Sequence, residues 1–261
     1  MWTDSHCHLN LIDLSPYEGD VTRLVQRAAD QGVMHLLCAG VDLKTTPNVM
    51  GLARCFENVY ASVGIHPNDV HCDPFNETQL MGFAKDEKVV GIGETGLDYH
   101  YDDVELELQK DVFKKHIELA KKIKKPLVIH SRDAKEDTIK ILKENNAQEV
   151  RGVMHCFAGD HEMANQAIEM DFYIGVSGIV TFSNAKTLQE VVSRLPLERI
   201  LVETDAPWLS PVPYRGKPNT PEYIPLIGEK IAEIKGISME EVAEQTTENF
   251  FQLFFQGKKK S

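Results

Sequence analysis

The sequence lacks long apolar runs, paired cysteines and an excess of basic residues. No apolar run approaches the ~18 residues that a membrane-spanning helix needs, and the N-terminus does not have the charged-then-apolar pattern of a signal peptide. Lys and Arg number 28 against 40 Asp and Glu, a net charge of -12 that argues against a broad basic surface for nucleic acid. Neither a disulfide framework nor a zinc ribbon is indicated, because the five cysteines are odd in number, widely scattered and without a C-x-x-C pair: Cys7, Cys38, Cys55, Cys72 and Cys156. These features predict a cytoplasmic protein without a membrane partner or an obligate protein partner.

Short Val-, Ile- and Leu-rich segments alternate along the chain with stretches of helical period, which indicates repeated βα units. Eight strands are predicted, at residues 2–6, 33–39, 59–65, 89–94, 126–130, 152–155, 172–176 and 200–203. Helices are predicted at 134–144, 163–170, 185–195, 224–234 and 239–255, the last with Ser238 as its N-cap. An open doubly wound sheet would normally carry a Gly-rich phosphate motif after its first strand, and none is there.

This pattern predicts an α/β fold, a TIM-like (β/α)8 barrel in a single domain with an extra C-terminal helix. The barrel is expected to cover residues 1–257, and residues 258–261 are expected to form a disordered basic tail. In such a barrel, the strand C-termini and the loops that follow them form the active face.

Six of the eight predicted strands finish in a histidine or a carboxylate. His6 and His8 share one face of the first strand because side chains alternate with period two. The other strand-end residues are His66, Glu94, His130, His155, Glu203 and Asp205. Each alone has an ordinary structural explanation, as a cap, a core histidine or a paired loop carboxylate.

Together at one end of a barrel, buried imidazoles and carboxylates would cost several kcal/mol each unless they shared a ligand. The set exceeds one tetrahedral site and suits two divalent ions about 3.5 to 4 Å apart. Mixed His and carboxylate ligands fit Zn²⁺, Mn²⁺, Fe²⁺ or Ni²⁺, whereas Mg²⁺ prefers oxygen-rich sites. Strand alternation points Cys7 and Cys156 away from the neighbouring histidines, so no cysteine need be a ligand.

Eight segments stand out along the chain: DSHCHL, GIHP, GETGLDYHY, KPLVIHSRDA, GVMHCFAG, GVSGIVTF, LVETDAPWLSP and YRGKPNTP. In sequence and in order they resemble the TatD family of metal-dependent deoxyribonucleases, within the amidohydrolase superfamily. The resemblance runs from Thr3 to about Leu253. The resemblance implies metal-dependent hydrolysis of DNA phosphodiester bonds, often from the 3′ end and commonly with Mg²⁺. It also implies that one ion is held by His6, His8, Glu94 and Asp205. The second ion would be held by Glu94, which bridges the two, and by His130 and His155.

Two catalytic residues follow from this scheme, the bridging Glu94 and Asp205, which would take a proton from the attacking water. Substrate contacts are expected from His66, Arg132, Glu203 and Arg215. Glu203 has a second expected role, which is to order the residues behind the metal ligands. Three aromatic residues beside the motifs are possible stacking partners for a base: Tyr99, Phe157 and Trp208.

The predicted function is a divalent-metal-dependent deoxyribonuclease that acts on single strands or 3′ ends, with DNA as its partner. Its net charge of -12 favours a single-stranded end in a metal-rich cleft over duplex binding. One alternative is a barrel metallohydrolase for a small amide, lactone or phosphoester, because the same metal pair can attack a carbonyl. A metal-holding protein without catalysis is a third reading, which the complete ligand set makes the weakest.

Overall fold

Eight parallel strands form one sheet, with each strand beside its neighbours in the sequence. The computed structural model describes residues 1–101 and 105–257. The strands are β1 (Trp2–Cys7), β2 (Val33–Ala39), β3 (Val59–Val63), β4 (Val89–Asp98), β5 (Leu127–Arg132), β6 (Gly152–Met154), β7 (Phe172–Val176) and β8 (Ile200–Val202).

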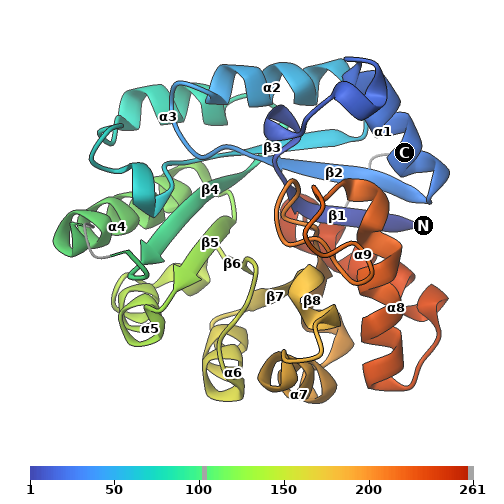
Figure 1. Cartoon of the computed structure of the whole chain (residues 1–261). Coiled ribbons are helices and arrows are strands. Elements are labelled where there is room, and N and C mark those ends of the chain that lie inside the picture. Colours follow the sequence, from blue (N-terminus) through green and yellow to red (C-terminus); the bar gives the residue numbers. More distant parts are fainter. Residues whose placement is uncertain (102–104, 258–261) are drawn as a thin grey trace.

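Helices alternate with the strands and, except for the last one, lie around the outside of the sheet (Figure 1). They are α1 (Val21–Asp30), α2 (Thr46–Cys55), α3 (Glu77–Ala84), α4 (Leu106–Ile123), α5 (Lys135–Glu144), α6 (His161–Glu169), α7 (Lys186–Arg194), α8 (Ile224–Lys235) and α9 (Met239–Phe255). The arrangement confirms the predicted (β/α)8 barrel with an extra C-terminal helix. The five predicted helices agree with α5 to α9 to within two residues at each end.

The barrel closes between β1 and β8 through contacts that run beyond the ends of the two strands. The amide of Asp205 donates to the His6 carbonyl at 2.9 Å, and the amide of His8 donates to the Ala206 carbonyl at 2.8 Å. Lower down, the Ser5 hydroxyl donates to the Val202 carbonyl at 3.0 Å. The first and last strand ends are therefore fixed to one another at the level of His6, His8 and Asp205.

The strands read as continuous apolar runs because both of their faces are covered. In β5, Leu127 and Ile129 face the helices and belong to the large outer core. Val128 faces the interior and belongs to a separate inner cluster. All three side chains are fully buried, as expected of parallel strands packed on both sides.

The N-terminal end of the barrel is closed by α9. Seven inward-facing strand residues form the floor: Leu37, Tyr60, Val90, Val128, Val153, Tyr173 and Leu201. Four residues of α9 pack onto them: Phe250, Phe251, Leu253 and Phe254. The spacing of these residues gives α9 one apolar face, and the Ser238 hydroxyl caps the helix by accepting the amide of Glu241 at 3.1 Å. This end of the barrel is thus a packed aromatic plug.

Strand lengths differ from the prediction where the site is built. β4 continues to Asp98, beyond the predicted end at Glu94, and β5 continues to Arg132. β6 and β8 end at Met154 and Val202, one residue earlier than predicted, so the polar residues that follow them lie on loops. Two register shifts, between Asp4 and Cys7 and between Ile92 and Thr95, also interrupt the strands near the site.

Within residues 1–101 and 105–257, no helix is long and apolar enough to cross a membrane. The predicted basic tail at residues 258–261 lies outside the described part of the chain.

Candidate metal centre

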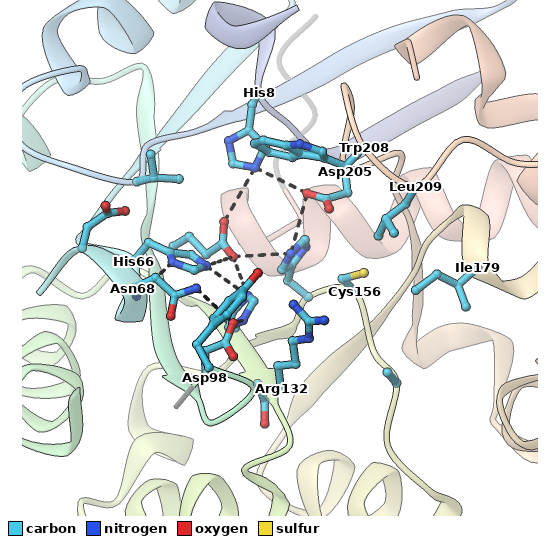
Figure 2. Close-up of a pocket in the computed structure, with 18 residues that line it drawn as sticks. His8, His66, Asn68, Asp98, Arg132, Cys156, Ile179, Asp205, Trp208 and Leu209 are labelled. Carbon is cyan, nitrogen blue, oxygen red and sulfur yellow. Dashed lines mark hydrogen bonds and ion pairs between the residues drawn. The ribbon is translucent and has the colours of Figure 1, made fainter. Parts of the chain in front are cut away.

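A pocket of about 550 Å³ opens at the C-terminal ends of the strands (Figure 2). Its polar lining includes His8 after β1, His66 after β3, Glu94 in β4, His130 in β5 and Asp205 after β8. His155, which follows β6, also lines it. The topology therefore brings together the strand-end residues that the sequence singled out, on the face where barrel enzymes carry their active sites.

Four donor atoms form a first cluster between β1, β4 and β8. His6 Nε2 lies 3.2 Å from His8 Nε2 and 3.3 Å from Glu94 Oε2. Asp205 Oδ1 lies 3.4 Å from His8 Nε2 and 3.8 Å from His6 Nε2. His8 Nδ1 lies 3.1 Å from the Ala39 carbonyl, which leaves Nε2 to face the cluster.

A second cluster surrounds the other oxygen of Glu94. Oε1 lies 2.9 Å from His130 Nδ1, 3.4 Å from His66 Nε2 and 3.5 Å from His155 Nε2. His66 Nε2 and His130 Nδ1 are 3.3 Å apart. His155 also reaches the first cluster, because its Nε2 is 3.8 Å from Asp205 Oδ1 and its ring stacks on His6.

These spacings suit metal coordination. Two donors bound about 2.1 Å from one tetrahedral ion lie about 3.4 Å apart, close to the separations within both clusters. Glu94 directs one oxygen to each cluster, as a bridging carboxylate would. The two sets of residues can therefore hold divalent ions, and the His and carboxylate donors fit several metals without selecting one.

The charges of the site favour bound cations. Burial would raise the pKa of Glu94, but the surrounding histidines hold it well below its ordinary value. Burial likewise acts against a charged His155, yet Glu203 and Glu94 raise the pKa of its imidazole to about 10. For Asp205, burial is outweighed by His8 and His155, so its pKa is lowered. The carboxylates are thus charged and attract positive charge into the pocket.

Two buried carboxylates lie behind two of the candidate ligand histidines. Glu203 Oε1 lies 3.0 Å from His155 Nδ1, and Glu203 is fully buried. Asp98 Oδ2 lies 3.0 Å from His130 Nε2 and accepts the side-chain amide of Asn68 at 3.1 Å. Carboxylates in this position fix the orientation of a ligand imidazole and raise its basicity.

The sequence pattern does not indicate Asp98 as a site residue, because it predicts that β4 ends at Glu94. Asp98 nevertheless lies in the GETGLDYHY segment. Asp4 is a buried residue of the β1–β8 seam that the sequence pattern also does not single out. Its carboxylate accepts the amide and the hydroxyl of Thr204, at 3.0 and 2.6 Å, across the seam between β1 and β8. Burial raises the pKa of Asp4 to about 8. Its spacing of two from His6 was the available signal, since both lie on the first strand.

Only some of the residues predicted to contact substrate line the pocket. His66 and Arg132 line the pocket, where His66 Nε2 can serve as a metal donor or as a phosphate contact. Arg215 is not among the described residues that line it, and its guanidinium lies 4.1 Å from the centre of the Phe182 ring. Glu203 does not fit a substrate contact because it is buried behind His155. Of its two expected roles, ordering a ligand is the one that agrees with its position.

Cys156 corrects another expectation. The alternation that was to point it away from the site stops because β6 ends at Met154 and Cys156 has a left-handed backbone, with φ 44°. It lines the pocket, and its sulfur lies near donor atoms of His155 and Asp205. Cys7 behaves as predicted, since its thiol donates to the Leu37 carbonyl at 3.4 Å.

The chain is similar to known proteins over nearly its whole length. The sequence profile described as TatD related DNase matches residues 3–255. The chain is 42% identical over 255 residues to the uncharacterized metal-dependent hydrolase YabD of Bacillus subtilis, covering 97% of this chain and 99% of that protein. It is 41% identical over 251 residues to the uncharacterized metal-dependent hydrolase YcfH of Escherichia coli K12, covering 96% and 94%. The crystal structure of YjjV, a TatD homolog of E. coli K12, superposes with a TM-score of 0.90 at 29% identity, covering 97% of each chain. The chain therefore belongs to the TatD family of metal-dependent hydrolases.

Proposed function

We propose that this protein hydrolyses phosphodiester bonds of DNA, acting on single strands and from the 3′ end. One observation carries the proposal: Glu94, which lines the pocket, directs one carboxylate oxygen to each of the two donor clusters. When bound there, two divalent ions supply an activated water and neutralise charge on a scissile phosphodiester.

The residues of the chain have separate parts in this reaction. Asp205 turns Oδ1 toward His6, His8 and His155, so Oδ2 accepts the proton of the attacking water. Arg132 is the single Arg or Lys among the described residues that line the pocket, and it contacts the phosphate that follows or precedes the scissile one. His66 supplies a further donor beside Glu94.

The charge balance supports an end-processing enzyme. A protein of net charge -12 with one cation in its pocket does not bind long stretches of duplex through phosphates. A single-stranded end needs only the pocket itself, where bound ions supply the positive charge. The preference for 3′ ends rests on the family resemblance.

The test is a nuclease assay on single strands labelled at the 3′ or the 5′ end, with Mg²⁺, Mn²⁺ and Zn²⁺ supplied in turn. We expect early release of the 3′ label and a ladder of shortened 5′-labelled strands, both absent in Asp205→Asn. Intact strands with all three metals contradict the proposal. Faster turnover of a small amide, lactone or phosphoester would assign the pocket to such substrates instead.

A further inference from the structure

One of the three aromatic residues beside the motifs is exposed in the pocket. Phe157 is only 3% exposed, and the Tyr99 hydroxyl donates to Asp137 at 2.7 Å, outside the pocket lining. Trp208 lines the pocket and is 50% exposed, which is unusual for so large an apolar ring. Its ring meets His8 edge to face, with 5.1 Å between the ring centres. The exposed indole therefore stands directly beside the metal ligands.

The backbone around Trp208 is held firmly. Its amide donates to the Asp205 carbonyl at 2.9 Å, and its own carbonyl accepts the side-chain amide of Asn219 at 2.6 Å. Leu209 follows in the left-handed region, with φ 57°, a conformation that a leucine adopts only when its surroundings impose it. Gly178 allows the approach, because a Cβ there would come within 2.1 Å of the Leu209 carbonyl oxygen. The backbone at Trp208 and Leu209 is thus fixed by these contacts.

A group of apolar residues lines one side of the pocket. Figure 2 shows Leu209 and Ile179 on the side away from His66, Asn68 and Asp98. We call Trp208, Leu209 and Ile179 the apolar arm. It borders the first metal cluster, since Trp208 contacts His8 and follows Asp205 by three residues. A ligand bound at the metal cluster can therefore extend a flat, apolar group along the arm.

We infer that the apolar arm receives one unpaired nucleobase of the strand, stacked on Trp208, next to the scissile phosphate. The inference rests on the proposed nuclease function and adds a specificity-determining residue to it. A base in a duplex has its faces covered by stacked neighbours and its edge paired, so it cannot enter the arm. Stacking on an aromatic ring tolerates every base, which gives selection for an unpaired end without selection for sequence.

The first test combines two enzymes with two substrates. One single strand carries normal 3′-terminal nucleotides, and the other carries abasic tetrahydrofuran residues there. For Trp208→Ala we expect kcat/KM on the normal strand to fall about 5- to 150-fold, the range of base–aromatic stacking. On the abasic strand the same variant should stay within about twofold of the wild type.

Val212→Ala is the matched control, because Val212 is 45% exposed in the same loop and is not among the described residues that line the pocket. It should leave both rates unchanged. An equal loss on both strands for Trp208→Ala, or no loss on either, contradicts the inference while the nuclease proposal stands. A wild type that cuts neither strand contradicts the proposed function, and this inference falls with it.

Binding can be read without turnover. The chain has two tryptophans, and Trp2 is buried. Thymidine monophosphate titrated into the Mn²⁺-loaded protein should quench the fluorescence of Trp208, whereas deoxyribose 5-phosphate should not. Trp208→Phe should lose the quenching. Quenching that persists in Trp208→Phe, or that deoxyribose phosphate produces equally, places the base elsewhere.

Discussion

The two ends of the barrel are built from the same eight strands, but their inward-facing side chains are of opposite kinds. At the N-terminal end, inward side chains such as Val128 and Leu201 meet Phe250 of α9 in an apolar plug. At the C-terminal end, inward side chains are imidazoles and carboxylates, and Glu94 alone lies within 3.7 Å of nitrogen atoms of five histidine rings. The plug gains stability from burial, whereas the donor clusters assemble charges that burial disfavours.

Apolar packing and the polar donor groups are therefore concentrated at opposite ends of the barrel axis. The plug seals one end and keeps the strands in register, which allows the other end to hold polar groups that would otherwise be destabilising. Substitutions at the two ends should therefore have distinct signatures. Those in the plug should lower the free energy of unfolding, and those in the donor clusters should lower metal affinity and activity.

The largest effect is expected from Glu94→Gln. An amide of the same shape cannot bridge two cations, so activity should fall at least about a thousandfold. The melting temperature of the wild type should rise when metal is added, because metal binds the folded state, and the variant should lose much of this rise. Activity assays and thermal melts with and without metal measure both quantities.

Glu107→Gln is the matched control for Glu94→Gln, since Glu107 is an exposed carboxylate in the first turn of α4. It should keep the activity and the metal-dependent rise in melting temperature. A Glu94→Gln protein that remains active would contradict this prediction, because the donor clusters would then not be needed for the reaction.

Phe250→Ala tests the plug. Phe250 is fully buried, and removing such a ring costs about 3 to 5 kcal/mol in free energy of unfolding. Metal affinity at low temperature should not change while the protein is folded. Urea unfolding and metal titration check the two statements. Phe255→Ala, at the half-buried edge of the plug, should cost clearly less, and an equal cost would show that the plug is not the centre of this packing.

The two ends also differ in how well the sequence predicts them. Apolar period and strand count sufficed for the barrel and for α9, because those features depend on burial alone. The ligand candidates followed from their position at strand ends. The sequence does not predict the role of Asp98, because β4 runs four residues beyond its predicted end at Glu94. It also does not predict that Cys156 lines the pocket, because β6 ends one residue before its predicted end at His155. Strand ends shaped by polar contacts leave no periodic signal.

His116 is a buried histidine close to the site that we expect to stabilise the fold without taking part in the reaction. It packs from α4 onto β3, where Nδ1 contacts the Val112 carbonyl at 2.8 Å and Nε2 accepts the amide of Ile65 at 3.1 Å. Nε2 can accept the Ile65 amide only when the ring is neutral, and burial lowers the pKa of His116 to about 4. The unfolded chain binds this proton more readily, with a pKa near 6.5.

The contribution of His116 is therefore complete above about pH 6.5 and is lost as the pH falls toward 4. The free energy of unfolding should decrease by up to ~3 kcal/mol over this window through this residue. Urea unfolding of wild type and His116→Gln at several pH values gives the difference, with the exposed His71→Gln as control. Parallel pH profiles for wild type and His116→Gln would contradict the assignment.

Glu203 lies deep in the barrel like a core residue, but it should behave as part of the metal end. In Glu203→Gln the side chain keeps its volume and loses the charge that orients His155, so metal affinity should fall about 10- to 100-fold with little change in metal-free stability. Calorimetric titration of the metal-free protein measures the affinity, and the exposed Glu190→Gln is the control.

Gly175→Ala offers a second approach, because the new Cβ would come within 2.6 Å of Glu203 Oε2 and displace the carboxylate. The opposite result is that both variants bind metal as the wild type does but unfold more easily. Glu203 would then stabilise the fold, as the residues of the plug do, and would not support metal binding through His155.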